Sequence, residues 1–296
     1  MKYAWMDTER RHFPLLAMCA ALSVSPSGYR AWKRGGAPNR QRLTDTQLLA
    51  LIRAIHAELK GAYGSPRMLA ELRGRGFAVG KARVERLMRA HGLRARHKRR
   101  YKATTDSKHT LPVADNRLAR AFMPTAPNRV WTADITYLWT EEGWLYLAVV
   151  LDLFNREVVG WALQPRMTAD IVAEALTMAT GRRQPAAGLL HHSDRGSQYA
   201  SRPFQDQLAG SGMICSMSRK GNCWDNAPTE SFFNSLKNER VHGTRYTTRQ
   251  AAAADVFDYI EVFYNRKRRH STLGYKSPRQ FMDAWISAQH RGNLVA

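Results

Sequence analysis

The chain has 296 residues, 44% of them apolar, with eight Trp and eleven Tyr, so it can bury a sizeable core in two or three folded units and is not a disordered chain. Its 46 Lys and Arg against 24 Asp and Glu give a net charge of +22, which favours a polyanionic partner, nucleic acid first, over a merely solvated surface. The excess lies in the front part, where residues 1–120 hold 26 basic and 8 acidic side chains (+18) and the remainder holds 20 and 16 (+4).

The first 40 residues predict two short helices arranged as a helix-turn-helix. Phe13–Leu22 is apolar enough for one helix, and Pro26–Lys33 predicts a second, with Ser25 as its N-cap and proline in the first helical position. The second helix offers Arg30 and Lys33 as candidate contacts to DNA phosphates and base edges. A small helical hairpin without a DNA role is the alternative for this stretch.

The same apolar stretch imitates a secretory signal, because basic residues precede Phe13–Val24. Pro14 interrupts the run, and Asp7 and Glu9 place acidic groups in the leader, so a signal peptide is disfavoured. The longest apolar run elsewhere, Trp144–Leu151, is far too short to span a membrane. We therefore expect a cytoplasmic protein with no membrane partner.

Residues 44–93 predict a second basic helical module. Thr44 and Gln47 form a capping-box pattern ahead of an apolar stripe at helical spacing. Further helices are predicted from Ser65 and over Lys81–His91, which Gly92 ends. The last of these helices presents two outward candidate DNA contacts, Arg83 and Arg86.

Residues 94–125 show no apolar periodicity and predict a basic linker. Binding along DNA phosphates is favoured over a simply solvated charge run, because helical basic modules precede the segment. The cations of this segment include two candidate contacts, Arg99 and Arg100, together with Arg94, Arg96, Lys98 and Lys102.

From Val130 onward the pattern changes to one typical of strands. Val130–Trp139, Trp144–Leu151 and Glu157–Leu163 predict three antiparallel strands, with a turn at Glu141–Gly143. The unbroken apolar run Trp144–Leu151 indicates a central strand covered on both faces. The remaining elements are expected as a helix capped by Thr168, a strand over Gly188–His192, a helix near Pro203–Ala209, a strand over Met213–Met217 and a helix from about Asn226.

This β-β-β-α-β-α-β-α order predicts an α/β fold with a mixed sheet, as in ribonuclease H-like cores. The expected domains are a helix-turn-helix-like segment (1–40), the basic helical module (44–93), the linker (94–125), the catalytic core with C-terminal helices (126–285) and a tail (286–296).

The three cysteines, Cys19, Cys215 and Cys223, form no CxxC pair and are odd in number, which argues against a disulfide framework and fits a reducing compartment. Cys215 and Cys223 could join neighbouring histidines in a zinc site, but their spacing matches no usual zinc pattern. Buried apolar thiols are the favoured interpretation.

Two aspartates stand where strands place ligands. Asp134 lies inside the first predicted strand, where an uncompensated buried charge is costly, and Asp194 follows the strand that ends near His192. Phosphoryl transfer on DNA uses two hard cations, and carboxylates are their preferred ligands. Either residue alone could be a turn or cap residue, but together they indicate a metal site.

Glu230 is the third candidate ligand. It shares one predicted helix face with Asn234 and Lys237, four and seven residues later, while the adjacent face is apolar. A solvated surface glutamate is the alternative. Asp152 competes with Asp134 as the first acid, but we expect it to end its strand and bond the Asn155 turn.

The segment Tyr264–His270 places an aromatic ring and five potential cations in seven positions after an amphipathic helix. Contact with the DNA backbone is one interpretation, and charge complementarity at a helix C-terminus is the other. The candidate contacts here are Tyr264, Arg266, Lys267, Arg268 and Arg269.

Asp194 and Glu230 are separated by 35 residues, the DD(35)E pattern, and Lys237 is the seventh residue after the glutamate. With these residues the sequence resembles the OrfB transposases of insertion-sequence family three, which are related to retroviral integrases. The resemblance covers nearly the whole chain, including the 63–93 module and the linker. The matching blocks are Trp131–Tyr137, Gly143–Trp161, His191–Tyr199, Ile214–Asn226, Glu230–Lys237 and Tyr264–Pro278.

The resemblance implies that Asp134, Asp194 and Glu230 are catalytic and hold Mg²⁺ or Mn²⁺ in a two-metal site. It also implies metal-dependent cleavage and strand transfer of double-stranded DNA at insertion-sequence ends, by a multimer in the bacterial nucleoid, with an upstream OrfA product or fusion. Lys237 is implied to contact DNA, and we add Arg195 and Asn234 as neighbours of the acids. A non-catalytic DNA-binding protein and a simple metal nuclease are the rival interpretations.

Overall fold

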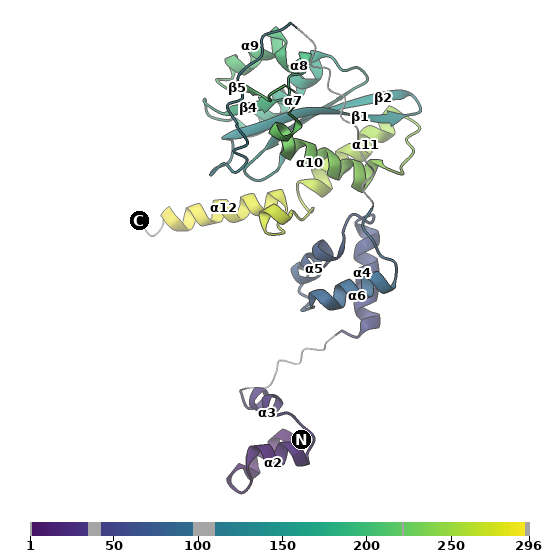
Figure 1. Ribbon diagram of the computed structural model, residues 1–296, viewed down its shortest axis with the longest axis vertical. Helices are drawn as coiled ribbons and strands as arrows, with labels where there is room; N and C mark the ends of the chain where they lie inside the picture. Colours follow the sequence, from purple (N-terminus) through teal and green to yellow (C-terminus); the bar gives the residue numbers. More distant parts are fainter. Residues whose placement is uncertain (1, 35–42, 97–109, 221, 294–296) are drawn as a thin grey trace. The chain divides into compact units, whose positions relative to one another are not determined.

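The computed structural model describes residues 2–34, 43–96, 110–220 and 222–293. The chain divides into two compact units, Met1–Ala50 and Leu51–Ala296 (Figure 1). Among the described residues, no helix is long and apolar enough to cross a membrane. The predicted candidates Arg99 and Arg100 lie outside the described residues.

The first unit contains one helix more than the sequence predicts. Helices α2 (Leu15–Ala21) and α3 (Pro26–Lys33) confirm the expected pair, and the Ser25 hydroxyl accepts a 3.0 Å hydrogen bond from the Gly28 amide as the predicted cap. The additional helix α1 (Lys2–Thr8), followed by the 3-10 turn η1 (Glu9–Arg11), buries Met6 in the same small core. So short a helix is stabilised by packing rather than by its own propensity, which is why periodicity missed it.

Three helices follow the gap after residue 34: α4 (Asp45–Glu58), α5 (Ser65–Gly74) and α6 (Lys81–Ala90). The predicted capping box is present. The backbone amide of Gln47 donates to the Thr44 hydroxyl (3.2 Å), and the backbone amide of Thr44 donates to the side-chain oxygen Oε1 of Gln47 (2.9 Å). The boundary between the two units falls within α4.

The second unit contains a mixed five-stranded sheet, as predicted. Its strands are β1 (Val130–Thr140), β2 (Gly143–Asp152), β3 (Val158–Gln164), β4 (Leu190–Ser193) and β5 (Ile214–Met217), in the order β3-β2-β1-β4-β5. The first three are antiparallel, and β4 and β5 run parallel to β1.

The sequence predicts a central strand over 144–151, covered on both faces, and β2 is such an interior strand, lying between β3 and β1. Leu147–Leu151 are all buried, as an unbroken apolar run predicts for an interior strand that is covered on both faces.

Helices cover both faces of the sheet (Figure 1). On one side α7 (Ala169–Arg183), α8 (Ser197–Ala200) and α9 (Arg202–Gly210) bury the main core cluster. On the other, α10 (Ala227–Leu236) packs on β1. Thr168 occupies the N-cap position of α7, but its hydroxyl bonds the side chains of Gln164 and Asp170 rather than a helix amide, which corrects the predicted cap.

Two predicted boundaries need correction. The expected tail 286–296 is helical as far as Asn293, because α12 runs over Pro278–Asn293. The expected linker does not extend to 125 as a tether: Leu118 is buried, and the amides of Arg117 and Leu118 both donate to the Ser216 hydroxyl. The remaining C-terminal elements are the π-helix η3 (Lys237–Val241), α11 (Arg249–Phe257), the π-helix η4 (Asp258–Tyr264) and the 3-10 turn η5 (Ser271–Leu273).

Candidate active site

Sheet register brings Asp134 and Asp194 together. β1 and β4 are parallel neighbours in which Thr132 pairs with His192, and each aspartate lies two residues beyond that pair. Side chains two residues apart share a face, and adjacent strands are separated by about 4.8 Å. The two carboxylates therefore stand side by side at the same end of the sheet.

Each of these carboxylates is held by a short-range backbone bond. Asp134 accepts a 2.8 Å hydrogen bond from the Ile135 amide, and Asp194 accepts a 2.9 Å bond from the Gly196 amide. A Cβ on Gly196 would lie 3.0 Å from the Asp194 carboxylate oxygen, so glycine lets this turn close on the acid. The strand-end position thus presents a carboxylate already oriented by its own loop.

Burial and the neighbouring Asp194 carboxylate raise the pKa of Asp134 well above its ordinary value. Glu230 adds to this rise, and the Lys237 ammonium opposes it. Burial also raises the pKa of Glu230. A cation between carboxylates whose ionisation is opposed by burial and by each other would stabilise their charged forms.

The start of α10 is tied to β1. The Asn226 side-chain amide donates to the Ala133 carbonyl at 3.1 Å, and the Thr229 hydroxyl donates to the Thr132 hydroxyl at 2.7 Å. Both bonds are buried. They place Glu230, in the first turn of α10, within electrostatic reach of Asp134.

The loop before α10 is held by Asp225, a residue the sequence analysis missed. Its carboxylate accepts from the Arg219 amide (3.1 Å) and guanidinium (3.0 and 2.9 Å), from Arg120 (3.0 Å) and from the Asn116 side chain (2.9 Å). These donors, Arg219 first, lower the pKa of Asp225, whose side chain is fully buried. We call Asp225 with Asn116, Arg120 and Arg219 the loop latch.

Glu230 and Asn234 lie four residues apart within α10, as predicted for a shared helix face. α10 ends at Leu236, and Lys237 follows directly as the first residue of the π-helix η3. Lys237 is buried, and its ammonium lies 4.8 Å from the centre of the Tyr137 ring. Burial lowers the pKa of Lys237 to about 8, against the opposing effect of Asp134. Asn234 is exposed and accepts a 2.7 Å bond from Asn238.

Within the described part of the chain, no three His, Cys, Asp or Glu side chains form a group that could hold one metal ion. The charges of Asp194 and of Glu230 both act on Asp134, which places the three acids within electrostatic reach of one another. Oxygen donors of this kind suit Mg²⁺ or Mn²⁺, and the raised pKa of Asp134 fits a position that a divalent cation would stabilise.

Three of the predicted DNA contacts near the C-terminus have structural roles instead. Tyr264 and Arg268 are each 2% exposed, and the Arg268 guanidinium donates two bonds to Glu239, at 2.6 and 2.7 Å. Arg269 donates a 2.5 Å bond to Glu71. The pattern of residue types did not distinguish these from exposed cations, because burial here depends on acids far away in sequence.

The other predicted contacts are more accessible. Arg195 is partly buried, and its Nε donates to the Ser218 carbonyl at 2.5 Å. Lys33 pairs with Asp7 at 2.7 Å but keeps an exposed side chain. Arg83 is partly buried. The exposed candidates are Arg30, Arg86, Arg266 and Lys267.

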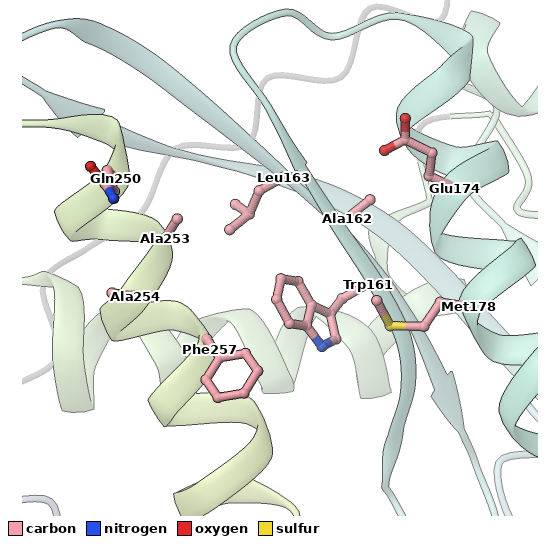
Figure 2. Close-up of a pocket in the computed structure, with 9 residues that line it drawn as sticks. All are labelled: Trp161, Ala162, Leu163, Glu174, Met178, Gln250, Ala253, Ala254 and Phe257. Carbon is pink, nitrogen blue, oxygen red and sulfur yellow. The ribbon is translucent and has the colours of Figure 1, made fainter.

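A separate hollow of about 540 Å³ lies away from the carboxylates, between β3, α7 and α11. Figure 2 shows Trp161 of β3 facing Phe257 of α11, and the two ring centres are 6.1 Å apart. Its lining is mostly apolar, with Glu174 and Gln250 as the polar members. It contains none of the predicted site residues.

Comparison with known families matches three parts of the chain. Residues 124–223 and 230–284 match models described as integrase core domains, and residues 43–101 match a helix-turn-helix-like domain. The helix-turn-helix match thus falls on the second helical module rather than on residues 1–40. The two integrase matches together contain all three candidate acids.

Individual relatives match over nearly their whole length. The chain is 46% identical to an uncharacterized 31 kDa protein of insertion element IS600 from Shigella sonnei, over 90% of this chain and 98% of that protein. It is 43% identical to the transposase InsF for insertion sequence IS3A from Escherichia coli K12, over 95% of this chain and 98% of that protein.

Solved structures give weaker likenesses. A simian T-cell lymphotropic virus intasome covers 78% of this chain and 73% of its own at 15% identity, with a TM-score of 0.43. The HTLV-2 integrase catalytic core in complex with magnesium covers 53% of this chain and 97% of its own at 16% identity, with a TM-score of 0.38.

Proposed function

This chain belongs to the family of insertion-sequence transposases that includes the IS3 transposase InsF, and we propose that it cuts DNA at insertion-sequence ends and transfers the strands to a new site. The observation that carries this proposal is the register-matched pair Asp134 and Asp194 within a chain that is 43% identical to InsF over 95% of its length. Chemistry of this kind needs no covalent protein intermediate, since a 3′-hydroxyl can attack the target phosphodiester directly.

We further propose Asp134, Asp194 and Glu230 as the catalytic acids and as ligands of two Mg²⁺ or Mn²⁺ ions. Such ions supply polarisation of the scissile phosphate and activation of the attacking water or hydroxyl. The acids are supported in this role by their places in the middle of β1, just after β4 and in the first turn of α10, and by the effect of Asp194 and Glu230 on the pKa of Asp134. The hydrogen bonds from Asn226 and Thr229 to β1 orient the helix that carries Glu230.

Lys237 is proposed to contact a DNA phosphate beside these acids. Its ammonium interacts with the Asp134 charge, and a pKa of about 8 leaves it largely protonated at neutral pH. A buried ammonium attracts a phosphate more strongly than an exposed one, because less water screens it. The Tyr137 ring beneath it limits the directions from which a phosphate can approach.

The helical modules are proposed to grip double-stranded DNA, as the helix-turn-helix-like match over 43–101 suggests. The exposed cations Arg30, Arg86, Arg266 and Lys267 suit phosphate contact, which is salt-dependent and independent of sequence. Pairing of two DNA ends calls for a multimer, and we propose an upstream OrfA product or fusion as the partner that adds sequence specificity. We also propose that the protein works in the bacterial nucleoid, where its DNA substrate lies.

The test incubates the protein, with and without its upstream partner, with labelled insertion-sequence ends and Mg²⁺. Asp134→Asn, Asp194→Asn and Glu230→Gln should each reduce cleavage and strand transfer by roughly a thousandfold or more. Asp206→Asn is the matched control, since this α9 side chain is 70% exposed and lies outside the site.

DNA binding measured on the same variants separates chemistry from folding. Removing an acid from a chain of charge +22 should leave the affinity for phosphate unchanged or raised. Cleavage at the parental rate in all three acid variants would refute the site assignment. Binding without any cleavage by the unmodified protein would instead favour the rival function, a non-catalytic DNA-binding protein.

A further inference from the structure

The hairpin between β1 and β2 carries a cluster of aromatic side chains that its fold does not bury. Trp139 and Trp144 are directly paired across the strands and are 58% and 44% exposed. Their ring centres are 4.8 Å apart, and the Tyr137 ring lies 4.9 Å from that of Trp144. We call Tyr137, Trp139 and Trp144 the hairpin platform. Exposed indoles at this density usually mark a binding surface, because a fold gains nothing by leaving them in water.

The hairpin platform lies on the same strand as the proposed catalytic acid Asp134. Tyr137 is three residues and Trp139 five residues beyond Asp134, or about 10 and 17 Å along β1, and because side chains alternate along a strand both rings leave β1 on the face opposite the Asp134 carboxylate. Lys237 connects the two regions, because its ammonium lies 4.8 Å over the Tyr137 ring and interacts with the Asp134 charge. In the described sheet, β4 pairs with β1 over Val130–Thr132, so the hairpin half of β1 projects past its neighbour on that edge.

The charges around the hairpin platform suit a polyanion. The two acids of the turn are engaged: Glu141 pairs with Arg245, and Glu142 accepts a 2.8 Å bond from the Arg249 amide. The Arg249 guanidinium also donates to the Trp144 carbonyl at 3.1 Å, which holds a cation beside the platform. The Arg245 side chain is 87% exposed. The two acids and these two arginines balance in charge, so the Lys237 ammonium over the Tyr137 ring supplies the net positive charge beside the platform.

We propose that the hairpin platform binds unpaired nucleobases of the DNA strand next to the scissile phosphate. Every base has a π-face, so stacking on aromatic side chains combined with backbone contact to cations is how proteins hold single-stranded DNA without reading its sequence. Paired bases in a duplex are already stacked and cannot use such a surface. The position beside the acids relies on the proposed function, whereas the stacking itself needs no catalysis.

The test measures binding of the full chain, in metal-free buffer, to single-stranded oligothymidine and to a duplex of equal length. Trp139→Ala with Trp144→Ala should weaken oligothymidine binding by about fivefold or more and leave duplex binding within about twofold. Trp139→Phe with Trp144→Phe should recover most of the affinity, because phenyl rings still stack. Phe257→Ala is the control, an exposed aromatic on α11 outside the platform.

Photocrosslinking gives a second readout that does not depend on an alanine variant folding. An oligonucleotide carrying 5-iododeoxyuridine should crosslink to the 137–144 hairpin, as mapped by mass spectrometry. The proposal would be overturned if the double alanine variant lost equal affinity for single-stranded and duplex DNA, or lost none. Crosslinks confined to segments outside the hairpin would overturn it too. Platform-dependent binding that is tighter for oligouridine than for oligothymidine would overturn the assignment to DNA.

The binding assay also separates this inference from the proposed function. Asp134→Asn should abolish strand transfer and leave oligothymidine binding intact, since the platform residues are unchanged. If the unmodified protein shows no strand transfer but the platform variants still lose single-strand binding, the platform stands and the enzymatic proposal fails.

Discussion

The side-chain amide of Asn226 donates a hydrogen bond of 3.1 Å to the backbone carbonyl of Ala133. Ala133 directly precedes Asp134, and Asn226 lies four positions before Glu230. This buried hydrogen bond therefore links the two segments that carry two of the proposed catalytic acids. Asn226 follows directly after Asp225, the centre of the loop latch. The geometry of the site therefore depends on residues that hold the loop between β5 and α10.

We expect Asp225→Ala to lower the free energy of unfolding by about 2–3 kcal/mol, because Arg219, Arg120 and Asn116 lose a buried charged acceptor. The folded-state pKa of Asp225 is lowered, so this stabilisation is present above the ordinary value of 3.8 and is lost as the pH falls through the folded value. Denaturant unfolding from pH 7 to below pH 2 measures it, because the stabilisation falls only below pH 3.8. If the difference in free energy of unfolding between parent and variant stayed constant as the pH fell below 3.8, the ion-pair explanation would be contradicted.

The same variant should raise the Mg²⁺ concentration needed for half-maximal cleavage, because the helix carrying Glu230 is less well held. Asp206→Ala, on the exposed face of α9, is the control for both measurements. An unchanged Mg²⁺ requirement together with lowered stability would mean that the loop latch supports only the fold.

Asp134→Asn should be more stable than the parent in metal-free buffer at neutral pH. Burial and Asp194 raise the folded pKa of Asp134, so its ionisation opposes folding at every pH above the ordinary value of 3.8. The difference should vanish below that value, grow as the pH rises from it towards the folded pKa, and stay constant above the folded pKa. Thermal unfolding across this range measures it, and a variant that is less stable at pH 7 would refute the account.

With added Mg²⁺ the parent should become more stable than Asp134→Asn. An ion that binds the folded parent raises its melting temperature, and the variant with a weakened site gains less. Equal shifts in the two proteins would argue against Asp134 as a ligand.

Arg268→Ala should cost about 3–5 kcal/mol, because it leaves Glu239 buried without its main partner. Replacing both, as Arg268→Met with Glu239→Leu, should recover part of that loss. Arg266→Ala, two positions earlier and exposed, should change stability by less than about 0.5 kcal/mol. It should instead weaken DNA binding and reduce the salt slope by about one. Similar stabilities for the two alanine variants would contradict the burial argument.

Gly160→Ala should destabilise the core by about 1–3 kcal/mol. A Cβ at Gly160 would lie 2.2 Å from the Ala175 carbonyl oxygen and 2.7 Å from Ala179, so α7 would have to move off β3. Gly181→Ala in the same helix meets no atom within 4 Å and should stabilise by about 0.5–1 kcal/mol. Thermal unfolding should therefore show a lower melting temperature for Gly160→Ala and a higher one for Gly181→Ala. Changes of the same sign would contradict the close packing of β3 on α7.

Much of the fold follows from periodicity. The strand pattern from Val130, the helix signals at Ser25 and Thr44 and the run at Trp144 all correspond to observed elements, because alternation and helical spacing report directly which side chains are buried. The spacing of Asp194 and Glu230 likewise identified the candidate acids. The nearness of Asp194 to Asp134 depends on the parallel pairing of β1 and β4, which no local pattern contains.

What the sequence determined by itself was most of the helices and strands, the mixed sheet and the three acids proposed to catalyse. The tertiary structure alone decided which charged side chains are buried and which stay exposed. Asp225 meets Arg120 across 105 residues, and Arg268 meets Glu239 across 29. The sequence does not show whether a charged side chain is solvated or paired. Its burial depends on whether the tertiary structure places an oppositely charged side chain beside it.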